Sequence, residues 1–189
     1  MNNKIFNAIK NKVGNRVLNK HSAKMKREKL FQGISTMKRV GILFEYNSNM
    51  YVAAKKLINF FASQKIEAFL IAFDDVKYDK KEKEGQGRPV PPNVKLFSRS
   101  DLNWYNKPES RNVSDFITLK FDLLIDMSCS SEYVYRYITT LSMAKCKIGG
   151  VEYNNDPFDW IFVEKTKDIS KFTIQIINFL TTVKIQNNV

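Results

Sequence analysis

The sequence predicts an α/β fold: a three-layer sandwich with a mostly parallel, Rossmann-like or flavodoxin-like sheet, preceded by a basic helical arm. Two observations predict it. Residues 121–150, FDLLIDMSCSSEYVYRYITTLSMAKCKIGG, read as strand, serine-rich turn, helix and strand. Such a βαβ unit joins two parallel strands by a right-handed crossover. Short apolar runs and helical patterns also alternate over the rest of the chain, which is typical of a parallel sheet covered by helices.

The central unit supplies the first elements. The run Leu123–Leu124–Ile125 is apolar throughout, as expected of a strand covered on both faces. The serines after it, Ser128, Ser130 and Ser131, can cap the helix that follows, because a serine oxygen accepts a bond from an unpaired backbone N–H. We expect that helix over residues 132–144 and the next strand over residues 146–149.

The flanking segments continue the alternation. Asn47 and Ser48 can cap the first helix of the body. A polar, glycine- and proline-containing stretch near residues 77–93 predicts a mobile loop, and residues 101–108 predict a turn with buried aromatic side chains. We expect further strands over residues 38–46, 65–73, 94–97 and 158–163, and helices over residues 50–63, 113–120 and 168–183.

Positive charge is concentrated at the N-terminal end. Residues 1–39 contain 11 Lys and Arg against a single acid, whereas the other 150 residues contain 20 Lys and Arg against 18 acids. We interpret residues 1–35 as a basic arm, helical to about residue 31, and residues 36–189 as one Rossmann-like domain. Within the arm, Ile5, Ile9, Val13 and Val17 form a narrow apolar stripe, and Gly14 weakens the helix by about 1 kcal/mol relative to alanine.

Several function classes find no support. The turn EYNSNMY after the first strand has no glycine for dinucleotide binding, and no phosphate-binding P-loop motif occurs. The single histidine, His21, lies in the arm, and the two cysteines, Cys129 and Cys146, give no zinc pattern. We find no catalytic set, and expect no cofactor and no metal. Without a signal peptide or an apolar run of membrane-spanning length, we expect a cytoplasmic protein with reduced thiols.

Two sets of candidate site residues follow. The basic arm predicts phosphate contacts from eight side chains: Lys10, Lys12, Arg16, Lys20, Lys24, Lys26, Arg27 and Lys29. The carboxyl ends of the predicted strands, where α/β proteins bind ligands, predict a pocket. Its candidate residues are Asn47, Ser48, Asp74, Asp126, Ser128, Ser130 and Ser131. Each of these is also an ordinary turn or cap residue.

The leading hypothesis is a non-catalytic RNA-binding protein associated with rRNA or the ribosome, because the arm carries nearly all of the net charge. Other readings of the arm stay open: plain packing on the body or a dimer contact, and binding to an anionic membrane surface. The body offers a possible contact for a protein partner. The alternative function is a small ligand-binding or enzymatic domain with its pocket at the carboxyl edge of the sheet.

The chain also resembles known families. The segments DLNWYNKP (101–108), KFDLLIDMS (120–128), AKCKIG (144–149) and FDWIF (158–162), with Asp115–Phe116, resemble a family of uncharacterised proteins of Bacteroidetes type. That resemblance covers about residues 30–183 and implies one domain without a stated activity. The pattern FDLLIDMS followed by AKCKIGG also resembles the N-terminal Rossmann-like half of heptosyltransferase-type glycosyltransferases. This second likeness implies a glycosyltransferase-like ancestry for the alternative function. Those enzymes also need a second Rossmann-like domain for the nucleotide-sugar, which we do not expect in this chain.

Overall fold

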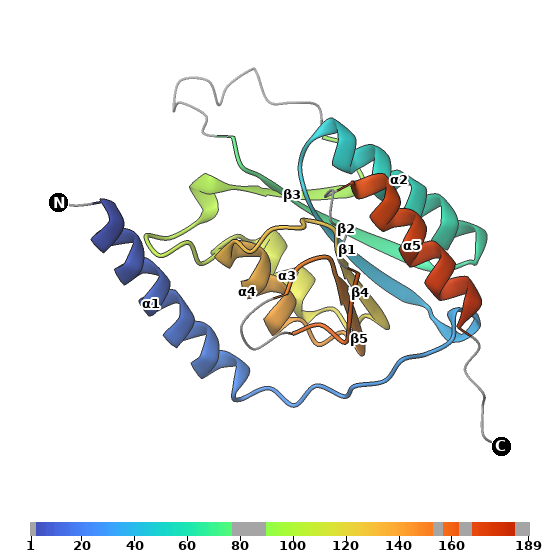
Figure 1. Cartoon of the computed structure of the whole chain (residues 1–189), viewed down its shortest axis with the longest axis horizontal. Helices are drawn as coiled ribbons and strands as arrows, with labels where there is room; N and C mark the ends of the chain where they lie inside the picture. Colours follow the sequence, from blue (N-terminus) through green and yellow to red (C-terminus); the bar gives the residue numbers. More distant parts are fainter. Residues whose placement is uncertain (1–2, 77–89, 153–156, 163–167, 184–189) are drawn as a thin grey trace.

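The computed structural model describes residues 3–76, 90–152, 157–162 and 168–183. They form one six-stranded sheet in which all paired strands are parallel, in the order β3-β2-β1-β4-β5-β6 (Figure 1). This is the Rossmann order and not the flavodoxin order, which settles the choice that the sequence left open. The strands are β1 (Arg39–Glu45), β2 (Glu67–Asp74), β3 (Val94–Ser98), β4 (Leu123–Asp126), β5 (Cys146–Gly149) and β6 (Trp160–Ile161).

Helices cover both faces of the sheet. On one face α2 and α5 lie side by side, and on the other α3 and α4 pack against the strands, with α1 outside α4 (Figure 1). The three-layer α/β sandwich is therefore confirmed. The helices are α1 (Asn3–Ser22), α2 (Ser48–Ser63), α3 (Arg111–Thr118), α4 (Tyr133–Leu141) and α5 (Ile169–Thr182).

Each face has its own apolar core, because β1 and β4 at the sheet centre send alternate side chains to opposite sides. Ile42 and Ile125 pack beneath α2 and α5, whereas Leu43 and Leu124 pack beneath α3 and α4, and all four are fully buried. Gly41 lies in β1 where a Cβ atom would come within 2.8 Å of the Phe121 ring. The absence of a side chain there lets the aromatic ring lie directly on the strand.

Helix caps were predicted correctly at one position and wrongly at another. Asn47 caps α2, because its side-chain oxygen accepts the Met50 N–H at 2.9 Å. The serines before α4 do not cap it: Glu132 is the N-cap residue and makes no side-chain cap bond. Instead the Ser128 and Ser130 hydroxyls accept the N–H groups of Ser130 and Glu132, which closes the turn before the helix begins.

Three other predictions are corrected. The arm helix ends at Ser22 and not near residue 31, and α4 ends at Leu141 and not at 144. Trp104 in the 101–108 turn is 53% exposed, so the predicted burial of its aromatic side chains is wrong for this ring. The predicted loop near 77–93 lies mostly outside the described residues.

Candidate nucleic-acid interface

Helix α1 docks on α4 through a face that the sequence pattern did not indicate. Gly14 and Leu18 are buried at the contact, whereas Ile5 and Ile9 of the predicted stripe are 57% and 46% exposed. A Cβ atom on Gly14 would lie 2.9 Å from the Tyr133 ring. The helix is continuous through Gly14, so this glycine serves close approach between two helices and does not break α1.

Polar contacts fix the same interface. The Tyr133 hydroxyl donates to the Gly14 carbonyl oxygen at 2.9 Å, and Arg136 donates to the Asn15 side-chain oxygen at 3.0 Å. Burial raises the pKa of Tyr133 well above its ordinary value, so the hydroxyl stays protonated and available as a donor. Helix α1 is therefore held in one orientation on the body.

After α1, residues 23–33 run along the body toward β1 (Figure 1). The Leu30 N–H donates to the Lys145 carbonyl oxygen at 3.1 Å, and the Phe31 ring packs at 5.3 Å from that of Phe179. Arg27 donates to both carboxylate oxygens of Asp159, with NH1 at 2.8 Å from Oδ2. Its side chain is only 11% exposed. This segment is thus a fixed part of the fold.

The eight predicted phosphate-binding residues divide into three groups. Five have exposed side chains: Lys12, Arg16, Lys20, Lys24 and Lys26. Lys10 is partly buried, and its ammonium lies 4.9 Å from the centre of the Phe6 ring. Arg27 is bound to Asp159, and the 70% exposed Lys29 side chain lies 3.5 Å from the same carboxylate. The side chains of these five cations therefore face solvent.

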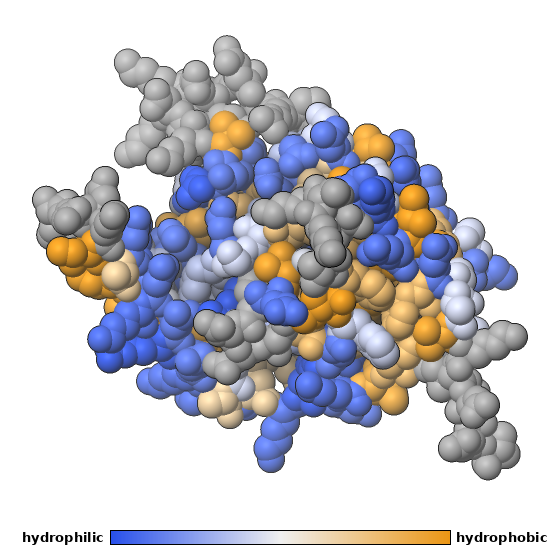
Figure 2. Space-filling view, viewed as in Figure 1, coloured by the Kyte–Doolittle hydropathy of each residue, from blue (hydrophilic) through white to orange (hydrophobic). Residues whose placement is uncertain are grey.

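Docking turns three of these cations into an ordered row. Because Gly14 and Leu18 face α4, the residues on the opposite side of the helix, Lys12, Arg16 and Lys20, face outward at intervals of four residues. We call these three residues the cationic ridge; along the helix axis it covers about 12 Å. Figure 2 shows hydrophilic side chains along α1, with an apolar group confined to its N-terminal end. Helix α1 contains no Asp or Glu.

The seven predicted pocket residues do not come together in one place. Asn47 and Ser48 line an open cavity of about 860 Å³ beside the start of α2, together with Tyr46, Tyr51 and Pro91. Ser131 lines a different cleft, between α1 and α4. The remaining residues are tied into the turns: Asp126 accepts the Ser128 N–H at 2.9 Å, and Asp74 accepts the Val76 N–H at 3.2 Å. Asp74 and Asp126 are both 2% exposed.

The carboxyl edge of the sheet is acidic. Burial, and then the charges of Glu45 and Asp126, raise the pKa of Tyr135 far above its ordinary value. Burial and the neighbouring Asp75 also raise the pKa of Glu132. Within the described ranges, no three His, Cys, Asp or Glu side chains form a group that could hold a metal ion. These acidic groups contrast with α1, which carries cations and no Asp or Glu.

Sequence reasoning missed two features of this region. One is Arg27, whose partner Asp159 lies 132 positions away, so that no local pattern could distinguish it from the exposed lysines beside it. The other is an amide-rich cleft between α1 and the turn around Asn106, which depends on the docking of α1. The sequence held one weak signal for this docking. Gly14 is a glycine inside a helical pattern, and such a glycine often serves close packing.

A model of a protein family matches residues 10–183. The chain belongs to that family, DUF6913, a family of unknown function. The predicted membership of an uncharacterised family is confirmed, while the likeness to heptosyltransferase-type enzymes stays a prediction. The match begins inside α1, so the family range includes the ridge, Leu18 and Arg27 but excludes Ile5, Phe6 and Ile9. No curated protein and no solved structure matches the chain.

In the part of the chain that the structure describes, none of the helices has the length and apolar character needed to cross a membrane.

Proposed function

We propose that this DUF6913 protein is a non-catalytic, cytoplasmic RNA-binding protein that contacts rRNA or the ribosome through the cationic ridge of α1. One observation carries the proposal: docking through Gly14 and Leu18 fixes α1 with Lys12, Arg16 and Lys20 outward. Cations on a rigid helix neutralise phosphates without an ordering cost for the backbone, and the released counterions favour binding. Lys24 and Lys26 extend the positive surface beyond the helix.

The same geometry favours a polyanion over a lipid surface. An interfacial helix buries its apolar face in the membrane, with cations on the opposite side. In this protein the side of α1 opposite the cationic ridge is occupied by α4, through Leu18. The exposed Ile5, Phe6 and Ile9 lie near the beginning of α1, outside the family range. A phosphate backbone needs only the ridge.

The test neutralises the ridge and compares it with a matched variant. We expect K12Q/R16Q/K20Q to lose affinity for a labelled rRNA fragment in fluorescence anisotropy. If each side chain contacts one phosphate, the slope of log K against log salt should fall by about 2, since each contact in a single strand contributes about 0.7. The control K55Q/K56Q/K120Q removes three exposed lysines from the body and leaves the slope unchanged.

Glutamine keeps the helix, because its helix propensity is close to that of lysine and arginine. Circular dichroism should therefore show equal helix content in both variants. The proposal is wrong if the ridge variant and the control bind RNA equally well, or if the wild-type protein shows no salt-dependent binding.

The cavity beside Asn47 and Ser48 favours a second candidate function, small-molecule binding by a domain of glycosyltransferase-like ancestry. The cavity lies beyond the carboxyl end of β1, next to the point between β1 and β4 where the strand order reverses. Ligands of open α/β sheets bind at such points. A thermal-shift screen of nucleotides and nucleotide-sugars should then raise the melting temperature. An unchanged melting temperature at millimolar concentrations of every compound would reject this second function.

A further inference from the structure

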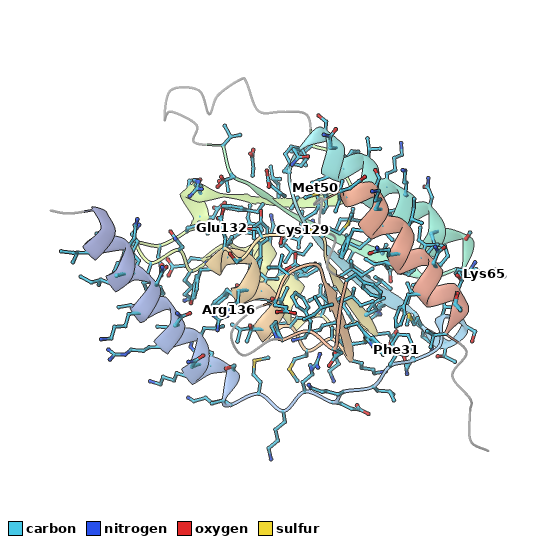
Figure 3. The ribbon with its side chains drawn as sticks, in the orientation of Figure 1. Phe31, Met50, Lys65, Cys129, Glu132 and Arg136 are labelled. Carbon is cyan, nitrogen blue, oxygen red and sulfur yellow. The ribbon has the colours of Figure 1, made fainter. Side chains whose placement is uncertain are left out.

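A polar cleft of about 400 Å³ separates the first half of α1 from the body. Three elements line it: α1 contributes Lys10 and Asn11, the segment after β3 contributes Arg99 and Asn106, and α4 begins at its floor beside Glu132. In Figure 3, Glu132 and Arg136 lie on the side of α4 that faces α1. The volume lies within the range of small-ligand sites.

The walls of the cleft are preformed. The Tyr133–Gly14 hydrogen bond holds α1 at its lower end. On the opposite side of the cleft, the turn at residues 103–107 is closed by a hydrogen bond from the Lys107 N–H to the Asn103 side-chain oxygen, at 3.0 Å. Asn106 occupies the left-handed region at φ 66°, and its N–H donates to the Asn103 carbonyl oxygen at 2.9 Å. A ligand would enter a cleft whose shape is set by the fold.

The lining suits a nucleobase. Asparagine amides present a donor and an acceptor side by side, which matches the edge of an unpaired base. Lys10 offers a cation at the same cleft. Glu132 is the single acidic residue among the described lining residues, and an ionised carboxylate only accepts hydrogen bonds. It therefore favours cytosine, whose N4 amine donates, over uracil, whose O4 accepts.

We propose that this cleft binds one unstacked nucleotide of single-stranded RNA, with a preference for cytosine, while the ridge, on the outer side of α1, contacts phosphates farther along the same strand. The inference rests on the proposed function, which supplies the phosphate contacts. It adds a preference for single strands and for one base. A base that is paired inside a duplex cannot reach the asparagine amides of the cleft, so the cleft distinguishes single strands from duplexes.

The experiment measures anisotropy of labelled oligocytidylate, oligouridylate and an RNA duplex of the same length. We expect oligocytidylate to bind tighter than oligouridylate, and E132Q to reduce that ratio by about tenfold, as one base-specific pair is worth about 1–3 kcal/mol. N11A should weaken binding to both single strands and leave the duplex affinity unchanged. The matched control N19A removes an exposed amide from the same helix, outside the cleft, and should change nothing.

The outcomes separate this inference from the proposed function. If the ridge variant loses RNA binding while N11A and E132Q behave as wild type, the cleft proposal is wrong and the ridge proposal stands. If the ridge variant keeps its RNA binding, the proposed function is wrong. Equal affinity of the wild type for single strands and duplex would also overturn the cleft proposal. Unchanged melting temperatures of N11A and E132Q show that a loss of binding is not a loss of fold.

Discussion

Lys147 places an amine inside the molecule, where it is 2% exposed. Its Nζ donates to the carbonyl oxygens of Thr139 and Thr140, at 2.6 and 3.2 Å, near the C-terminus of α4. Burial, and then the charge of Arg27, lower the pKa of Lys147 to about 7 against the opposing effect of Asp159. The neutral amine still has two N–H groups, one for each carbonyl.

This pKa predicts a specific dependence of stability on pH. Between about 7 and the ordinary value of 10.5, the unfolded chain binds a proton at Lys147 that the folded chain does not. The free energy of unfolding therefore rises with pH in this window, by up to about 1.4 kcal/mol per pH unit from this group. We expect K147M to flatten the rise in urea unfolding between about pH 8 and about pH 9.

The control for this prediction is K95M, which alters an exposed lysine of β3 and should keep the wild-type slope. K147M also removes the donors to α4 and lowers stability at every pH, so the slope and not the absolute value is the measurement. Parallel pH profiles for wild type and K147M would show that Lys147 keeps an ordinary pKa in the fold.

Single residues were predictable from sequence only where their partners are near in the chain. Asn47 as a helix cap is such a case, because its acceptor and the Met50 N–H are three residues apart. Arg27 and Lys147 are the opposite case. Both look like ordinary basic residues in the sequence, and their roles depend on Asp159 and on the end of α4, which only the fold brings close.

At the scale of elements, the strands and the helices that face the sheet were predictable from hydrophobic pattern. The register of β4 between β1 and β5 follows from the apolar run at Leu123–Ile125, which is buried on both faces. The observed bounds of these strands and helices differ from the predicted bounds by one to a few residues, as expected at the ends of elements. The seven candidate pocket residues illustrate the limit, since strand ends were placed correctly but the residues are spread: Asn47 and Ser48 line the cavity beside α2, whereas Ser131 lines another cleft.

Helix α1 shows why amphipathic pattern alone misleads. The apolar stripe from Ile5 to Val17 predicted one packing face, but close approach to Tyr133 requires Gly14 at the contact and brings Leu18 inward. Packing between helices is decided by the shape of both surfaces. Local propensity likewise continued the helix to about residue 31. The bonds of residues 27 and 30 to the body stabilise a non-helical backbone there instead.

For the whole molecule, the charge asymmetry has a structural meaning. The described part of the basic arm, residues 3–35, lies outside a body of nearly balanced charge and is docked along α4 and the ends of β4 and β5 (Figure 1). Mutual repulsion of the exposed lysines opposes docking. The apolar contacts of Leu18 and Phe31, together with the Arg27–Asp159 ion pair, offset this repulsion. Docking and RNA binding are therefore compatible functions of the same segment.

Two truncations of different length test this architecture. Deleting residues 1–35 removes the buried Leu18 and the partly buried Phe31, and leaves Asp159 without Arg27. Loss of one buried leucine costs about 2–5 kcal/mol and loss of one partner of a buried pair about 3–5 kcal/mol. Since about 1 kcal/mol shifts the melting temperature by about 2–4 °C in a chain of this size, we expect a fall of at least about 10 °C.

Deleting residues 1–9 is the matched comparison, because Ile5, Phe6 and Ile9 are exposed and the family range begins at residue 10. This shorter truncation should keep the wild-type melting temperature within about 2 °C, as expected for removing surface residues. It should also keep salt-dependent RNA binding, since the ridge is intact. An unchanged melting temperature after deletion of residues 1–35 would show that the arm is not docked in solution. In that case the ridge would have no fixed orientation, and phosphate binding would need to be explained by a free cationic tail.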